Sequence, residues 1–229
     1  MIYIIIFAFI LLGIITAYAS SNRLHSYFNK ISNNFAEINK TGNELLLFFI
    51  NKLKLNTKIL ERSNENKLDN SYNVIQKTIF LSNFVNNDKS VGSLTVAMHE
   101  LGHAVQHNKK SKLFYLYFTL SVLNRITSFF FAPLIIFLII SLFLSTFYIN
   151  LALILLLSFY VINLLSRILI IPLEKNASKI AINLLKEYKI FDEEELKCAK
   201  KLLNLALFTY IGGFFINYIN FFRKLIRSF

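Results

Sequence analysis

Residues 126–166 read ITSFFFAPLIIFLIISLFLSTFYINLALILLLSFYVINLLS. This stretch contains no Asp, Glu, Lys or Arg, and it is bracketed by Arg125 and Arg167. A helix of about 20 apolar residues is long enough to cross the hydrocarbon core of a bilayer, and the stretch has room for two. The polar segment Thr146–Asn150 is the natural turn between them. We therefore expect a transmembrane helical hairpin over residues 126–170, with both ends on the same side of the membrane.

The N-terminal residues form another apolar segment. Ile2–Ala19 is almost wholly apolar, and no charged residue precedes Arg23. Ala17-Tyr18-Ala19 fits a signal-peptide cleavage site, but a signal peptide begins with basic residues and Met1–Tyr3 contains none. We expect a retained transmembrane anchor at residues 1–22, with a cleaved signal peptide as the alternative.

The last apolar segment lies within residues 202–229. Leu202–Phe222 carries no charged residue, although Gly212-Gly213, Asn217 and Asn220 interrupt its apolar character. Such a helix either spans the membrane or lies in its interface. We expect residues 202–229 to form a C-terminal membrane-associated or spanning segment.

The composition of the whole chain is typical of a membrane protein. Hydrophobic residues make up 55% of its 229 residues, whereas soluble domains contain about 45–50%. The net charge is +12, but the basic residues are dispersed and accompany no recognition module, so we expect no nucleic-acid partner. Because Lys and Arg accumulate on the cytoplasmic side of membranes, they predict an external N-terminus and cytoplasmic polar segments.

Two polar segments, residues 23–125 and 171–201, separate the apolar ones. Apolar residues recur at helical spacing over Leu24–Ile38 and again over Leu45–Leu60. The segment Thr41–Asn43 breaks the pattern between them. We expect two amphipathic helices in the first part of the longer polar segment.

The pattern changes in the middle of that segment. Tyr72–Ser82 contains the β-branched residues of a short strand or hairpin. A helix then begins near Ser90, with Asp88 or Ser90 as its N-cap, and runs to about Gln106. The single cysteine, Cys198, excludes an intramolecular disulfide framework and a cysteine-rich metal site.

The helix that begins near Ser90 contains His99-Glu100-Leu101-Gly102-His103, an H-E-x-x-H motif. Histidines four residues apart project from one helix face, so both can reach a zinc ion about 2 Å away. The glutamate points about 100° around the helix, where it can act as general base on a zinc-activated water. The motif therefore predicts His99 and His103 as metal ligands, Zn²⁺ as cofactor and Glu100 as the catalytic residue.

A catalytic zinc site needs a third protein ligand. His107 continues the spacing of the two histidines, but eight residues along a helix rise about 12 Å and rotate off the face, which argues against it. Glu174 is the better candidate, although a glutamate near a helix start is nearly as well explained by the helix dipole. For stabilising an oxyanion, the candidates are Tyr72, Tyr188 and His107.

The residues around Glu174 favour close helix packing. Pro172 is expected just ahead of a helix that Glu174 opens. Ala177, Ser178 and Ala181 form a stripe of small residues that would allow close approach to the motif helix. Ser178 lies one turn beyond Glu174, where it can hydrogen-bond a metal ligand.

These segments resemble the YugP-like family of bacterial membrane neutral zinc metallopeptidases. The resemblance rests on Asn73–Gln106, which ends in VAMHELGHAVQ, and on Leu173-Glu174-x-x-Ala177-Ser178 after a hydrophobic hairpin. It implies that Glu174 is the third zinc ligand, as in gluzincins. The chain departs from the family at Lys175 and Asn176, where aromatic and acidic residues are common.

The sequence thus predicts a mainly α, integral-membrane helical bundle with a small zincin-like α(+β) catalytic part that contains residues 23–125 and 171–201. The expected function is that of a membrane-bound zinc metallopeptidase, an endopeptidase of the cell membrane with several spans and a cytoplasmic catalytic side. Its partners would be peptide or protein substrates, membrane proteins among them, and the lipid bilayer. The alternative is a non-catalytic membrane protein with a structural or vestigial metal site. A channel or transporter is disfavoured, because the hairpin contains no intramembrane acidic, basic or histidine residue.

Overall fold

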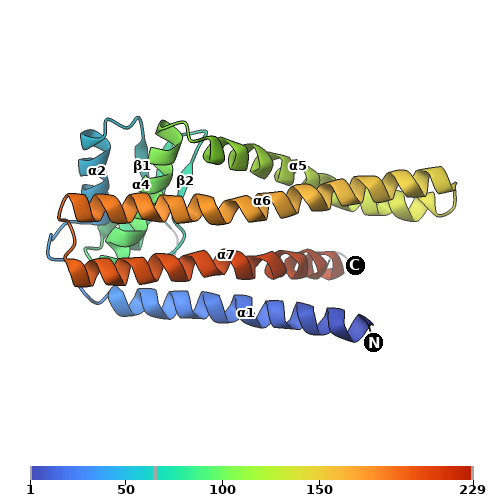
Figure 1. Ribbon diagram of the computed structural model, residues 1–229, viewed down its shortest axis with the longest axis horizontal. Coiled ribbons are helices and arrows are strands. Elements are labelled where there is room, and N and C mark those ends of the chain that lie inside the picture. The colour runs from blue at the N-terminus through green and yellow to red at the C-terminus, as the bar shows by residue number, and fades with distance from the viewer. Residues whose placement is uncertain (1, 64–65, 228–229) are drawn as a thin grey trace. The chain divides into compact units, whose positions relative to one another are not determined.

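The computed structural model describes residues 2–63 and 66–227, with side-chain surroundings for residues 15–63, 66–166 and 168–210. It is mainly helical and contains one small sheet (Figure 1). The elements in chain order are α1 (Ile2–Ile31), α2 (Gly42–Lys52), β1 (Lys58–Arg62), β2 (Ser71–Asn73), β3 (Thr78–Ser82), α3 (Asn83–Asn87), α4 (Val91–Asn108), α5 (Lys112–Ser141), α6 (Thr146–Glu187) and α7 (Glu193–Arg227).

The chain divides into two compact units. The first contains residues 1–109 and 174–229, and the second contains residues 110–173. Helix α6 contributes residues to both units.

Helix α4 occupies the centre of the first unit. It contacts α1, α2, α3 and α7 as well as strands β2 and β3. Helices α1 and α7 run side by side (Figure 1). The core contains fully buried side chains from several helices, among them Phe28, Phe49, Leu94, Met98, Leu101, Leu185 and Leu202. Burying side chains of this kind is the main favourable contribution to folding, at about 1.5–3 kcal/mol each.

The sheet has the order β1-β3-β2. Strands β2 and β3 pair antiparallel, so the strand or hairpin expected over Tyr72–Ser82 is confirmed. Strand β1 pairs parallel with β3. The helix expected to continue to Leu60 is therefore wrong, because α2 ends at Lys52 and the residues from Lys58 onward pair with a strand that lies later in the chain.

The first amphipathic helix also ends earlier than its apolar spacing predicts. Helix α1 is continuous from Ile2 and stops at Ile31. Beyond it, Phe35 forms an isolated bridge with Ser90, and the N–H of Ala36 bonds to the carbonyl of Lys89. These long-range hydrogen bonds pair backbone groups that a longer helix would otherwise have paired. The predicted break is confirmed, since Thr41 caps α2 through a capping box with Glu44.

The second unit contains α5 and the first part of α6. The two helices are joined by polar contacts: Asn163 donates to Asn124, and the hydroxyl of Ser166 donates to the carbonyl of Leu120. The turn lies at residues 142–145, a few residues before the predicted one. Both helices are long and apolar enough to cross a membrane.

The two terminal apolar segments are described only in part. The backbone of residues 1–22 from Ile2 onward belongs to α1, and that of residues 202–229 as far as Arg227 belongs to α7. The predictions that these segments enter the membrane depend largely on side chains outside the described residues.

Helix α6 corrects the prediction about Glu174. Pro172 lies inside α6, so Glu174 does not open a helix but lies well within one. A proline removes one backbone hydrogen bond, and the apolar residues on both sides keep the helix continuous. The helix-dipole explanation for Glu174 is therefore excluded, because the dipole acts only at the first and last turn.

Candidate metal centre

The motif helix α4 begins with a hydrogen-bonded cap. Ser90 is the N-cap, and its side chain accepts a bond from the N–H of Ser93. The carboxylate of Asp88 accepts bonds from the hydroxyls of both serines. Both candidates for this cap therefore take part, Ser90 directly and Asp88 by orienting it. The cap fixes where the helix starts, and thereby which side chains of α4 face the core.

Gly102 allows α6 to approach α4 within the motif itself. A Cβ atom at Gly102 would lie 2.5 Å from the carbonyl oxygen of Ala177, so only glycine fits. Ala177 and Ala181 are fully buried, which confirms the prediction of a small-residue stripe. Because Glu174 lies one turn before Ala177, this contact carries its carboxylate towards the histidines.

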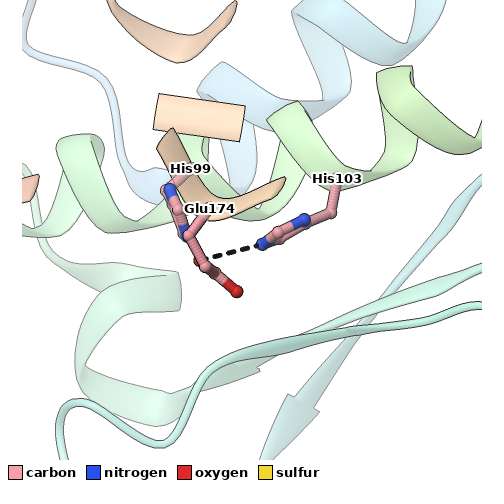
Figure 2. Close-up of side chains that lie close together, drawn as sticks. All are labelled: His99, His103 and Glu174. Carbon is pink, nitrogen blue, oxygen red and sulfur yellow. Dashed lines mark hydrogen bonds and ion pairs between the residues drawn. The ribbon is translucent and has the colours of Figure 1, made fainter. Parts of the chain in front are cut away.

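The structure brings His99, His103 and Glu174 together (Figure 2). Oε2 of Glu174 lies 3.0 Å from Nε2 of His99 and 3.5 Å from Nε2 of His103. One ligand atom from each of the three residues lies within 4.8 Å of the others. Ligand atoms about 2.0–2.2 Å from a tetrahedral zinc ion are roughly 3.3–3.6 Å apart. The group therefore fits a zinc ion after a small inward movement of the rings.

Each imidazole is also held by its other nitrogen. Nδ1 of His99 lies 3.3 Å from the hydroxyl of Ser178, and Nδ1 of His103 lies 3.1 Å from Oε1 of Gln106. An amide oxygen only accepts, so Nδ1 of His103 carries a proton, and Nε2 is the ring nitrogen that faces Glu174. Gln106 is itself fixed, because its amide donates to Oδ1 of Asn176 at 2.9 Å. Such bonds orient metal-binding histidines.

The charges in the group favour a cation. Burial lowers the pKa of His103, but the charge and hydrogen bond of the Glu174 carboxylate outweigh it and raise the pKa to about 9. The buried carboxylate thus stabilises positive charge beside both rings. Two imidazoles and one carboxylate are the ligand set of a common class of catalytic zinc sites.

Glu100 is buried beside these ligands without being one of the three converging residues. It is 7% exposed, and the backbone N–H of Tyr72 in β2 donates to its carboxylate. Burial raises the pKa of Glu100, although the charges of His99 and His103 oppose the rise. A raised pKa brings a carboxylate closer to the value that suits a general base near neutral pH.

The three residues considered for stabilising an oxyanion make contacts outside the group of His99, His103 and Glu174. The hydroxyl of Tyr72 lies 2.7 Å from Nδ1 of His107, which is one helical turn beyond His103. His107 is outside the metal group, as the rise of the helix predicts. Tyr188 packs edge-on against Phe48 and Phe49 in an aromatic cluster.

Sequence reasoning missed three supporting groups: Gln106, Asn176 and the backbone N–H of Tyr72. Asn176 had been noted only as a departure from the resembling family, yet it fixes the side chain that holds His103. The spacing of Gln106, three residues after His103 on the same helix, is the one local signal that pointed to it. Nothing in the local sequence indicates the Tyr72 contact, because it joins a strand to a helix.

The comparisons with known proteins agree with this geometry. No curated protein and no solved structure matches the chain. One family model, described as "Putative neutral zinc metallopeptidase", matches residues 3–228. The match covers nearly the whole chain, and the family is the one that the motifs resemble. The chain belongs to this family of neutral zinc metallopeptidases.

Proposed function

We propose that the chain is a membrane-embedded endopeptidase that hydrolyses peptide bonds with one zinc ion. The observation that carries this proposal is the convergence of His99, His103 and Glu174, with the separate carboxylate of Glu100 buried beside them. His99 and His103 would bind the ion through Nε2, and Glu174 through its carboxylate. When bound, the ion lowers the pKa of water to about 7 and polarises the scissile carbonyl.

The protein's own residues would move the proton. Glu100 takes a proton from the attacking water as the oxygen of that water bonds to the carbonyl carbon. It then gives a proton to the departing nitrogen as the C–N bond breaks. The N–H of Tyr72 keeps the Glu100 carboxylate in position through both steps. Ser178 and Gln106 keep the two rings oriented.

An extended substrate cannot pair with β3, because β1 and β2 already pair with its two edges. Strand β2 has one edge outside this sheet, and the N–H of Tyr72 there bonds to Glu100. We propose that the substrate main chain runs beside β2, near Glu100, and uses backbone groups other than this N–H.

The membrane location is part of the proposal. The α5 helix and the first part of α6 would cross the bilayer as a hairpin, because they have the required length and apolar composition. The excess of Lys and Arg in the polar segments would keep the metal centre on the cytoplasmic side of the cell membrane. Membrane proteins are then natural substrates.

The test is metal analysis and peptide hydrolysis of the protein purified in detergent. The wild type should contain about one zinc ion per chain and cleave an unstructured protein such as casein. Glu174→Ala should lose both zinc and activity, whereas Glu100→Gln should lose activity and keep zinc. Glu187→Gln, an exposed carboxylate at the end of the same helix as Glu174, is the matched control and should change neither.

Two outcomes would overturn the proposal. If Glu100→Gln cleaves as fast as the wild type, Glu100 is not the base and the alternative of a structural or vestigial metal site gains support. If Glu174→Ala retains zinc with unchanged affinity, the three-residue site is wrong.

A further inference from the structure

A cavity of about 210 Å³ opens beside the metal centre. His99, Glu100, Glu174 and Ser178 form its polar end. The cavity therefore begins at the groups that would bind the ion and transfer the proton.

The remaining wall is mostly apolar and comes largely from α7. Leu202 and Leu203 are buried, and Ala206 and Leu207 lie partly exposed one turn further on. Val96 of α4, Leu24 of α1 and Leu68 add apolar surface, and the uncharged polar residues Asn70, Thr209 and Tyr210 also line the cavity. An apolar wall of this kind stabilises an apolar group by about 25 cal/mol for each Å² removed from water.

The size and charge of the cavity restrict what it holds. Pockets for whole drug-sized ligands measure roughly 300–1,000 Å³, so this cavity suits one side chain rather than a complete small molecule. Apart from His99, the only acidic or basic side chains among the described residues that line it are Glu100 and Glu174. A lysine or arginine would compete with the metal ion for these carboxylates, and an acidic side chain would meet no counter-ion.

The chemistry decides which substrate residue is involved. Glu100 must reach the departing nitrogen to protonate it, and the next substrate side chain is attached to the carbon bonded to that nitrogen. We infer that this cavity is a specificity subsite that binds a medium-sized apolar side chain, such as Leu or Phe, of the residue that supplies the departing amine. The inference rests on the proposed peptidase function and adds its substrate class.

The experiment uses quenched fluorescent peptides that differ only in the residue after the cleaved bond: Leu, Phe, Ala, Asp or Lys. Mass spectrometry identifies the cleaved bond in each. The wild type in detergent with zinc should cleave the Leu and Phe peptides with kcat/KM at least ~10-fold above the Ala, Asp and Lys peptides. Ala206→Leu narrows the apolar wall and should reduce the preference for Leu and Phe over Ala by about tenfold.

Phe208→Ala is the matched control on the same helix. Phe208 is 59% exposed and does not line the cavity, so the preference should stay unchanged. Binding supplies a second measurement that needs no turnover. In the Glu100→Gln background, fluorescence anisotropy should give tighter binding of the Leu peptide than of the Ala peptide, and Ala206→Leu should remove the difference.

The outcomes separate this inference from the function on which it rests. A zinc-loaded wild type that cleaves none of the peptides or casein contradicts the peptidase function. Cleavage of all five peptides with equal efficiency contradicts only the subsite. An unchanged Leu-to-Ala ratio in a folded, zinc-binding Ala206→Leu variant does the same. If Ala206→Leu loses zinc, Leu207→Ala is tested in its place. An unchanged Leu-to-Ala ratio in Leu207→Ala would then show that the apolar wall does not contact the substrate, which contradicts the subsite.

Discussion

Helices α4 and α5 follow one another in the chain, but they differ in how far their side chains are buried. Most side chains of α4 are buried, including polar ones such as Ser93, Thr95, Glu100 and Gln106. In α5 only Phe114, Thr127, Leu134 and Ser141 are buried, although its sequence is the more apolar of the two. Phe129 in the interior of α5 and Phe143 just beyond its end are 76% and 85% exposed.

The comparison shows that apolar character alone does not decide burial within the protein. The polar side chains of a buried catalytic helix need hydrogen-bond partners within the protein, because unpaired buried polar groups are costly. A helix in lipid needs no protein cover, because the hydrocarbon itself solvates its side chains. Under our proposal α4 is the centre of the catalytic part and α5 is a membrane span.

The largest difference is expected for the buried carboxylate of α4. Glu100→Gln should lower kcat about 10²- to 10⁴-fold, the usual contribution of a general base, while zinc content stays the same. Steady-state kinetics and metal analysis measure both. A decrease smaller than about tenfold would mean that α4 is buried for structural reasons alone.

A charge placed on the surface that our proposal exposes to lipid should have the next largest effect. Leu157 of α6 is 62% exposed; Leu157→Lys should cost about 2.5–3.5 kcal/mol of membrane insertion. Ile75→Lys is the control: Ile75 is 81% exposed in the first unit, and its replacement should leave insertion unchanged. Membrane-fraction assays of both variants measure the difference. Equal insertion would show that the exposed apolar helices face water.

The close packing of α4 against α6 predicts a third, smaller difference between α4 and α5. A Cβ at Gly102 meets the backbone of Ala177, so Gly102→Ala should destabilise the first unit by about 1–3 kcal/mol through overpacking, and should weaken zinc binding. Ala132→Leu enlarges an exposed residue of α5 and should change neither quantity. Thermal unfolding and zinc titration measure both variants. If Gly102→Ala keeps full zinc affinity, the helix contact does not position Glu174.

The smallest effect concerns the helix caps. Ser90 caps α4 through its side chain, whereas Ser111 at the start of α5 makes no such bond. Ser90→Ala should lower stability by about 1 kcal/mol, and Ser111→Ala should leave it unchanged within error. Denaturant unfolding in detergent measures the pair. Equal effects would show that Ser90 stabilises α4 in another way.

Much of the site could be predicted because its rules are local. The spacing of His99 and His103 places both on one face of a helix wherever that helix packs. Ser90 signals the helix start, and the small residues after Glu174 signal a close contact. The candidate ligands and base were identified from these patterns, and the structure brings the three ligands together.

The errors came from contacts between distant segments. The apolar spacing predicts a helix as far as Leu60, but Lys58–Arg62 pair with Thr78–Ser82. Helix α1 stops at Ile31 because Phe35 and Ala36 bond near the start of α4. Pro172 predicts a helix that begins just after it, but α6 runs through both Pro172 and Glu174.

The sequence by itself determined the H-E-x-x-H face, the cap of α4 and the apolar hairpin, because each depends on residues within a few helical turns. Only the tertiary structure decided that Glu174, rather than another carboxylate, meets the two histidines. It also decided that the backbone of Tyr72 holds Glu100. The physical reason is that helix geometry fixes the directions of side chains within one element. The packing of Gly102 against Ala177 fixes where two elements meet.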